Sequence, residues 1–275
     1  DLKEKIAYVV GGHHKSAEEL CYFVQHAYDE TMDGCLSYRE ECLGKLWKNK
    51  VWKILDRYGF TSQDTEVIDI CHVVSKLYKP SPNVLDSDFF EKLLLVGFMK
   101  HADHLASAGI KKLYKLSDAD FSFLFVHPLY NHQQSAYRSS GNVILSSPTG
   151  SGKTETAILW IKNQLEVIGE GRVFYILPFT ASINAMYERL SKCFGENGLF
   201  VGMRHGKLLQ YLENKMYSGD DSSVFEAREA LLHDFKSMVA PVNVVTPFQL
   251  LKHLFGLKGF EKGIAEWCGG YFIFD

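Results

Sequence analysis

The chain has 275 residues, enough for one large domain or two smaller ones, and its composition excludes several classes of protein. Hydrophobic residues make up 46% and charged residues 23%, so a disordered or collagen-like chain is excluded. The 30 basic and 33 acidic residues give a net charge of −3. Contact with nucleic acid would therefore have to use local patches and backbone amides, because there is no global positive field.

The cysteines and the apolar runs indicate a reducing, aqueous environment. The six cysteines are scattered without a Cys-x-x-Cys pair, which is typical of buried thiols rather than disulfides or a zinc ribbon. The longest nearly apolar run, 93–99, is too short to cross a membrane, and the first residues have no signal-peptide character. We therefore expect a cytoplasmic protein without membrane contact.

The first part of the chain, to about residue 115, has helical periodicity. Apolar residues recur at helical spacing over 47–58 and again over 67–77. Only two of the seven prolines, Pro80 and Pro82, fall here, which fits a helical domain that is broken once. The segment 111–128 is the expected connection to the next domain. The predicted division is a helical domain over 1–115, a linker over 116–128 and a second domain over 129–275.

From about residue 140, short apolar runs alternate with amphipathic helical patterns. Strands that alternate with helices predict a parallel sheet covered on both faces. Buried strands are predicted at 143–145, 173–177, 242–245 and 271–274.

A glycine-rich loop, Ser147–Thr154, lies between a predicted strand and a predicted helix. Glycines let backbone N–H groups surround a phosphate, and the helix N-terminus adds partial positive charge. Lys153 would neutralise the β and γ phosphates of ATP, and Thr154 would offer its hydroxyl to Mg²⁺. The alternative is a Gly/Ser-rich turn without a ligand. The residues predicted to bind the nucleotide here are Thr149, Gly150, Ser151, Gly152, Lys153 and Thr154.

Two further residues fit a nucleotide site. Asp275 ends the predicted strand 271–274, where an acidic residue commonly completes a Mg²⁺ site in such folds. Gln133 lies upstream of the loop, at a position from which a side chain could read adenine. Taken alone, Gln133 could equally be a surface amide, and Asp275 could be an ordinary carboxylate at a strand end.

Histidines and a carboxylate form a second candidate site. His13 and His14 follow an apolar run and two glycines, while Asp103 precedes His104 near the end of a helical segment. Asp103 continues an apolar helix face, where a carboxylate is costly unless it is paired or ligates a metal. Imidazole and carboxylate ligands suit first-row divalent metals. From these residues alone, ordinary core histidines and a salt-bridged aspartate are the favoured interpretation.

The order of these motifs resembles the CRISPR-associated helicase-nuclease of type I systems, in which an HD-type nuclease domain precedes a superfamily 2 DNA helicase. Gly12-His13-His14 is similar to that family's double-histidine motif, and 102–107 to its later metal-binding aspartate motif. Gln133 is similar to the glutamine ahead of motif I. The helicase stretches are 147–154 for motif I, 177–184 for motif Ia, 246–251 for the following DNA-contact motif and 272–275 for the start of motif II.

The resemblance implies a fold and a set of roles. The fold would be the C-terminal part of an all-helical HD-type domain followed by a RecA-like parallel-sheet lobe. His13, His14 and Asp103 would ligate one or two transition metals, such as Mn²⁺, Fe²⁺, Co²⁺ or Ni²⁺, and activate water against a DNA phosphodiester. The lobe would use ATP and Mg²⁺, with Asp275 as a catalytic residue, to move along single-stranded DNA that it contacts through the backbone. The partner would be an RNA-guided surveillance complex.

Some features depart from the family pattern. Lys15-Ser16 follows the double histidine, where the family often has glycine. We also expect three parts of the family pattern to lie outside these 275 residues: its first histidines, the motif II glutamate and the second helicase lobe. We therefore predict that the chain alone neither hydrolyses ATP efficiently nor cuts DNA. Two alternatives stay open: a superfamily 2 helicase with a non-catalytic, partner-docking helical domain, and a non-enzymatic interaction scaffold.

Overall fold

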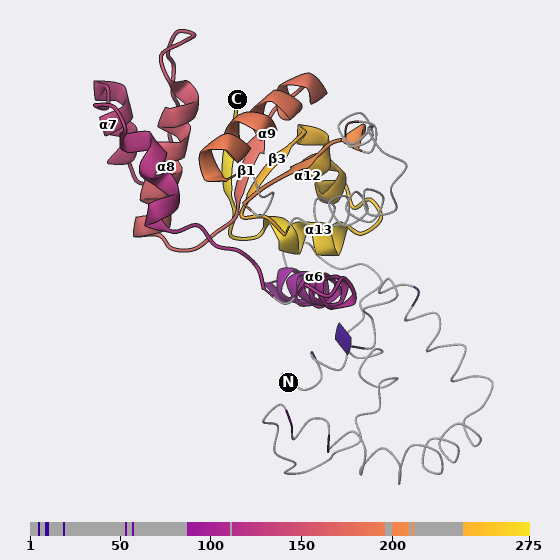
Figure 1. Ribbon diagram of the computed structural model, residues 1–275. Helices are drawn as coiled ribbons and strands as arrows, with labels where there is room; N and C mark the ends of the chain where they lie inside the picture. The colour runs from indigo at the N-terminus through magenta and orange to yellow at the C-terminus, as the bar shows by residue number, and fades with distance from the viewer. Residues whose placement is uncertain are drawn as a thin grey trace, which may run out of the picture. The chain divides into compact units, whose positions relative to one another are not determined.

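The computed structural model describes residues 87–110, 112–195, 200–208, 211 and 239–275, together with six isolated positions: Lys5, Val9, Val10, Glu19, Lys53 and Arg57. The chain divides into two compact units, 1–100 and 101–275. Most described elements belong to the second unit (Figure 1). The predicted division at 115 and 129 stays a prediction, and the predicted helices over 47–58 and 67–77 lie almost wholly outside the described residues.

A parallel sheet forms the centre of the second unit. Its four strands run in the order β2-β3-β1-β4, and β1 pairs with β3 and β4 along its whole length. The strands are β1 (Val173–Ile176), β2 (Val201–Arg204), β3 (Val242–Val245) and β4 (Tyr271–Phe274). Every residue of β1 and β3 is buried, as a sheet covered on both faces requires. The α/β core that the sequence predicts is thereby confirmed.

Helices cover the two faces of this sheet (Figure 1). Side chains alternate along a strand, so each strand contributes to both faces. Val173 and Tyr175 of β1 pack with α8, α9 and the 3₁₀ helix η1, whereas Phe174 and Ile176 pack towards α12 and α13. The described helices are α6 (Ser87–Ser107), η1 (Asp118–Phe125), α7 (Asn131–Tyr137), α8 (Lys153–Val167), α9 (Thr180–Phe194), α12 (Pro247–Leu254) and α13 (Phe260–Trp267).

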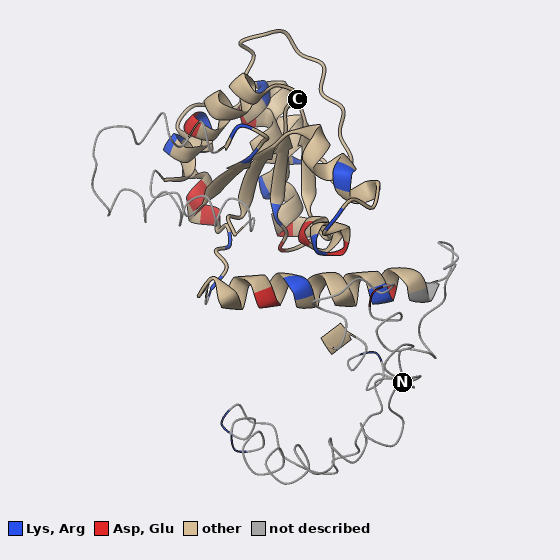
Figure 2. Ribbon diagram, turned by 90° about the vertical axis from the view of Figure 1, so that its right-hand side faces the viewer, with Lys and Arg blue, Asp and Glu red and all other residues tan. Residues whose placement is uncertain are grey.

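The two faces of the sheet are packed differently. The first is mainly aliphatic, with Leu159 and Ile183 fully buried against the strands. The second is aromatic: Phe174 stacks on Trp267 with ring centroids 4.2 Å apart, and on Phe272 at 5.3 Å. Charged residues lie mainly on helices and loops, and the strands are drawn largely in tan (Figure 2). No helix in the described part of the chain combines the length and the apolar character needed to span a bilayer.

The segment 143–145, predicted to be a strand, is not one. Val143 is 42% and Ile144 99% exposed, and the described sheet ends at β4. A strand needs a hydrogen-bonded neighbour. Gly141, just before this segment, is held on α8 instead: Trp160 Nε1 donates to its carbonyl oxygen at 2.9 Å, and its N donates to Gln164 Oε1 at 3.1 Å. The apolar, β-branched side chains of 143–145 are therefore not sufficient to make this segment a strand.

The segment expected to connect the two domains contributes to the core of the second unit. η1 lies within it, and Phe121 and Leu124 are buried against α8 and α9. Phe121 packs edge-on against Phe194 with ring centroids 5.7 Å apart. The strand β2 was not predicted, because its four residues include Gly202 and end in a charged residue, Arg204.

Candidate functional site

The glycine-rich loop Ser147–Thr154, called here the phosphate loop after its predicted ligand, leads from the segment 143–145 into α8 and depends on two glycines. Gly150 and Gly152 have φ angles of +82° and +80°, in the left-handed region that other residues avoid. Gly152 is the N-cap of α8. Within the loop, Ser151 Oγ donates to the Pro148 carbonyl oxygen at 2.8 Å. The loop is thus a tight turn whose backbone amides end at a helix N-terminus, an arrangement suited to an anion.

Lys153 begins α8, and its amine turns back over the loop. Its Nζ donates to the Ser147 carbonyl oxygen at 3.3 Å, and it contacts no carboxylate among the residues that the structure describes. A neutral carbonyl at that distance compensates little of the ammonium charge. The loop therefore carries a positive charge that an anionic ligand can neutralise.

Thr154 and Asp275 both lie beside Tyr175, although they come from α8 and from the end of β4. The Tyr175 hydroxyl donates to Asp275 Oδ2 at 2.6 Å, and the Thr154 side chain is close enough to influence its pKa. Burial, and then the Asp275 carboxylate, raise the pKa of Tyr175 far above its usual value. Arg189 Nη1 donates to Thr154 Oγ1 at 3.3 Å and pairs with Glu155. A hydroxyl and a carboxylate are thus brought together at the carboxyl edge of the sheet.

Gln133 lies against the phosphate loop and is only 6% exposed, so it is not a surface amide. Its Oε1 accepts from Tyr130 N at 3.0 Å, and its Nε2 would be 2.8 Å from a Cβ placed on Gly152. The neighbouring His132 Nε2 is 3.0 Å from the Ser151 carbonyl oxygen. α7 therefore holds the loop from one side, and only glycine leaves room for the Gln133 amide.

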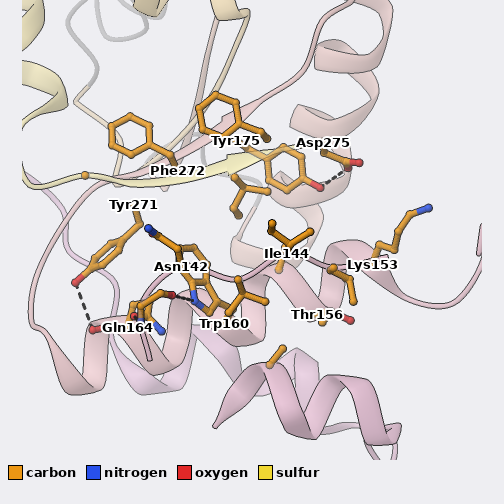
Figure 3. A pocket seen from close by; sticks show the side chains of 18 of the residues that line it. Asn142, Ile144, Lys153, Thr156, Trp160, Gln164, Tyr175, Tyr271, Phe272 and Asp275 are labelled. Atoms are coloured by element: carbon orange, nitrogen blue, oxygen red, sulfur yellow. Dashed lines mark hydrogen bonds between the residues drawn. The ribbon is translucent and has the colours of Figure 1, made fainter. Parts of the chain in front are cut away.

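A cavity of about 820 Å³ extends from this site along β4. It is bounded by α8, by β4 and by the segment 142–145 (Figure 3). Lys153, Thr156 and Asp275 line one end, and Trp160 and Tyr271 line the other. The exposed Val143 and Ile144 border this cavity on one side, and β4 borders it on the other. The cavity therefore separates the segment 143–145, which was predicted to be a strand, from the sheet.

The predicted metal ligands are only partly described. His13 and His14 lie outside the described residues, and Asp103 is half-buried on α6 beside His104. Within the described ranges, no three His, Cys, Asp or Glu residues lie together as a metal site would require. Burial, with the Lys262 charge, lowers the pKa of His104 below its usual value. The set of His13, His14 and Asp103 stays a prediction.

The sequence analysis missed a buried charge cluster around Glu266 of α13. Its carboxylate is 3% exposed and lies 3.1 Å from Lys262 Nζ, 3.4 Å from His101 Nδ1 and 3.7 Å from Arg204 Nη1. Burial alone would raise the pKa of the Glu266 carboxyl, but His101, Lys262 and Arg204 together hold it below its usual value. Only the Lys262–Glu266 spacing of four residues could have signalled the cluster, because the other members are distant in sequence.

Comparison with known proteins assigns the α/β unit to a family. The sequence profile of DEAD/DEAH box helicases matches residues 130–275, more than half of the chain, and the chain belongs to this family. Membership implies the use of ATP and Mg²⁺. The matched region contains Gln133, the phosphate loop and Asp275, whereas Asp103 and the histidine pair precede it. No solved structure matches the chain significantly.

Three curated relatives are similar to parts of the chain. A putative CRISPR-associated nuclease/helicase Cas3 of Methanocaldococcus jannaschii is 35% identical over 53% of this chain and 20% of its own length. The CRISPR-associated nuclease/helicase Cas3 of Methanothermobacter thermautotrophicus is 26% identical over 66% of this chain and 22% of its own length. The activating signal cointegrator 1 complex subunit 3 of Dictyostelium discoideum is 31% identical over 37% of this chain and 4% of its own length.

These relatives confirm the resemblance to CRISPR-associated helicase-nucleases that the motif order indicates. The chain spans about a fifth of the length of the two Cas3 proteins. The family assignment therefore applies to the α/β unit, which is the part of the chain that the profile matches.

Proposed function

We propose that the α/β unit binds ATP with Mg²⁺ at the phosphate loop and uses it to move along single-stranded DNA. One observation carries the proposal: Lys153 lies over a glycine-rich turn at a helix N-terminus, without a carboxylate partner in the described residues. A positive charge at a helix N-terminus, with no carboxylate of the described residues beside it, favours an anionic ligand there.

Each predicted residue has a role consistent with its position. The amides of 149–152 would surround the phosphates, and Lys153 would neutralise the β and γ phosphates. Thr154 and Asp275 each offer an oxygen beside the Tyr175 hydroxyl, and oxygen is the ligand atom that Mg²⁺ prefers. This arrangement fits the ion, which would polarise the terminal phosphate.

Nucleotide binding would exchange some of the present contacts. The Lys153 amine would leave the Ser147 carbonyl for a phosphate oxygen, and Thr154 Oγ1 would give up its bond from Arg189. Gln133 already lies beside the loop, from which its amide would read adenine. Because the existing bonds at Lys153 and Thr154 are both 3.3 Å long, little interaction energy opposes the exchange.

The proposal extends to the whole protein through its relatives. In it, His13, His14 and Asp103 ligate a divalent transition metal that activates water against DNA, and an RNA-guided complex supplies the displaced strand. Its support is the double-histidine and aspartate motifs and the names of the two Cas3 relatives. These His and carboxylate ligands suit such metals.

The first test is ATP hydrolysis by the full-length protein that contains this chain, measured with and without single-stranded DNA. Lys153→Ala is expected to reduce turnover by about 100-fold or more, since it removes the charge that faces the transferred phosphate. Lys258→Ala changes an equally cationic but exposed loop residue and should leave turnover unchanged. Equal turnover in all three proteins would contradict the proposed nucleotide site.

The second test addresses the nuclease. Single-stranded DNA cleavage is measured with Mn²⁺, with and without ATP, for the wild type and for Asp103→Ala. Loss of cleavage and of bound metal in the variant, with ATP hydrolysis retained, is expected. Unchanged cleavage would return Asp103 to a structural role and would favour a helicase whose helical domain only docks a partner.

A further inference from the structure

Arg189 of α9 reaches across to the first turn of α8, beside the phosphate loop. Its Nη1 donates to Thr154 Oγ1 at 3.3 Å, and its Nη2 pairs with Glu155 Oε1. A guanidinium carries only donors, so the threonine oxygen is the acceptor in this contact. The side chains of Arg189 and Glu155 are 49% and 38% exposed, so water can replace either contact. One guanidinium thus contacts two successive residues of α8, the first neutral and the second charged.

This contact lies beside the oxygens that the proposed function assigns to Mg²⁺. The Tyr175 hydroxyl donates to Asp275 (Figure 3). Burial and then Asp275 raise the pKa of Tyr175, whereas Thr154 and the charge of Arg189 lower it to a smaller extent. Arg189 is therefore close enough for its charge to act on the Tyr175–Asp275 pair. A monovalent cation of the chain itself thus lies beside the oxygens predicted to hold a divalent one.

Arg189 and Mg²⁺ cannot share the Thr154 oxygen. Mg²⁺ requires a nearly octahedral set of oxygen ligands at short range. A guanidinium on the same oxygen would keep a like charge next to the ion, and like charges at such a separation repel. The hydrogen bond itself is long and ends on a neutral oxygen, so the charge of Arg189 opposes Mg²⁺ more than the bond does. Arg189 must therefore leave Thr154 when the ion binds.

We propose that Arg189 competes with Mg²⁺ for the Thr154 hydroxyl and that Glu155 sets the strength of this competition. Glu155 neutralises part of the guanidinium charge and remains a partner for Arg189 once Thr154 is released. The pair thus fixes how much Mg²⁺ the site needs before it takes up ATP. The proposal rests on the proposed function and deepens it, because there the ion depends only on Thr154 and Asp275.

The test is the Mg²⁺ requirement of nucleotide binding by the full-length protein. Binding of a fluorescent, non-hydrolysable ATP analogue is followed by anisotropy while free Mg²⁺ is raised. Arg189→Ala is expected to lower the Mg²⁺ concentration at half-maximal binding about fivefold, because the competing charge is gone and Glu155 is left near the ion. Glu155→Gln is expected to raise it about threefold or more, because the guanidinium then keeps its whole charge beside Thr154.

The opposite signs separate competition from damage to the loop, which would raise the Mg²⁺ requirement in both variants. The double variant Arg189→Ala/Glu155→Gln removes both charges and should lie within about twofold of the wild type. Lys192→Ala is the matched control, because it removes the same charge from an exposed residue of α9 that makes no ion pair within the described part of the chain. It should change the requirement less than about twofold.

Nucleotide binding without the ion distinguishes competition from a phosphate contact. In EDTA, the wild type and Arg189→Ala should bind the analogue equally, since no Mg²⁺ is left to compete with the guanidinium. Weaker binding by the variant in EDTA would mean that the guanidinium contacts a phosphate and would overturn the proposal. Shifts of the same sign in Arg189→Ala and Glu155→Gln, or no shift in either, would overturn it as well.

Failure of the proposed function gives a different result. A wild-type protein that does not bind the analogue, or a Lys153→Ala variant that binds it as well as the wild type does, would overturn the nucleotide site and this proposal with it. Binding that is lost in Lys153→Ala, together with an unshifted Mg²⁺ requirement in Arg189→Ala, would overturn only the competition. The affinity of Mg²⁺ for free nucleotide is the same in every sample, so differences between variants report on the protein.

Discussion

Two groups of positive side chains in the α/β unit differ in whether a carboxylate of the same chain lies beside them. Around Glu266, the cations of Lys262 and Arg204 and the imidazole of His101 converge on one carboxylate that is almost wholly buried. At the phosphate loop, the Lys153 ammonium contacts only the Ser147 carbonyl among the described residues. The first group has its anion within the chain, whereas the second leaves a place for an external one.

The difference separates stability from binding. A buried carboxylate that neutralises several cations belongs to the fold, because removing it leaves those charges without compensation in a poorly solvated place. An exposed loop whose cation has only a weak internal partner contributes little to folding and can exchange that partner for a ligand. Substitutions at Glu266 should therefore affect stability, and those at Lys153 should affect nucleotide binding.

The largest effect is expected for Glu266→Ala. It leaves Lys262 and Arg204 without their anion and should lower the free energy of unfolding by about 3–5 kcal/mol. Urea denaturation followed by circular dichroism measures the change. Glu266→Gln keeps the side-chain volume and its hydrogen-bonding oxygen, and should lose less. A loss below about 1 kcal/mol in Glu266→Ala would show that the cluster is solvated and would remove the contrast with the loop.

The next prediction concerns pH and the neighbouring His253 of α12. This imidazole is 4% exposed, and Trp267 Nε1 donates to its Nδ1 at 3.1 Å. Burial, followed by the charges of Lys252 and Arg204, lowers the pKa of His253 to about 4. In the unfolded chain the pKa returns to about 6.5, so between these values the unfolded state binds more protons.

Stability should therefore fall as the pH drops from about 6.5 to about 4, by up to about 3 kcal/mol, with no contribution from His253 above that range. Denaturation midpoints across this range measure the effect. His253→Gln retains an acceptor for Trp267 Nε1 and should flatten the dependence within the same window. An unchanged profile in this variant would assign the acid sensitivity to other groups, such as Glu266.

Stabilisation by a bound nucleotide tests the prediction for Lys153 and the phosphate loop. Mg²⁺-ATP at about 100 times its Kd should stabilise the α/β unit by about 2.7 kcal/mol. Lys153→Ala should abolish this gain while leaving the stability without nucleotide nearly unchanged. Glu266→Gln should show the reverse, with lower stability and an intact nucleotide gain. A Lys153→Ala protein that still responds to Mg²⁺-ATP would place the nucleotide elsewhere.

The smallest effect is expected where α13 approaches α12. A Cβ on Gly263 would lie 2.1 Å from Nδ1 of the His253 ring, so Gly263→Ala forces the ring or the helix to move. The expected cost is about 1–3 kcal/mol, reduced by the better helix propensity of alanine. Gly206→Ala is the control, since nothing lies within 4 Å of its Cβ position, and it should change stability little. Equal effects would show that the contact between the helices is loose.

Local patterns predicted the parts of the fold that depend on neighbours in sequence. The apolar runs at β1, β3 and β4 became strands, and the loop glycines were identified from their order before a helix. The run at 143–145 was equally apolar, yet the preceding Gly141 is held on α8, accepting a hydrogen bond from Trp160 Nε1 and donating one to Gln164 Oε1. A pattern of side chains cannot indicate whether a strand finds a free partner, because pairing depends on distant residues.

The candidate site shows the same division. Spacing alone identified Lys153, Thr154 and Asp275 as phosphate and Mg²⁺ residues, although their roles stay predictions. Only the tertiary structure shows that the Tyr175 hydroxyl donates to Asp275 beside Thr154 and that Gln133 packs on Gly152.

By itself, the sequence determined the alternation of strands and helices and the place of the glycine-rich turn before α8, because both arise from residues close together along the chain. Tertiary structure alone decided where the buried charges go and which aromatic rings stay in water. Glu266 meets Arg204 and His101 across long stretches of sequence, and Phe174 and Phe179 differ in exposure only because one lies within the sheet and the other beyond its edge. Charge compensation and burial are properties of the packed chain, so no local pattern encodes them.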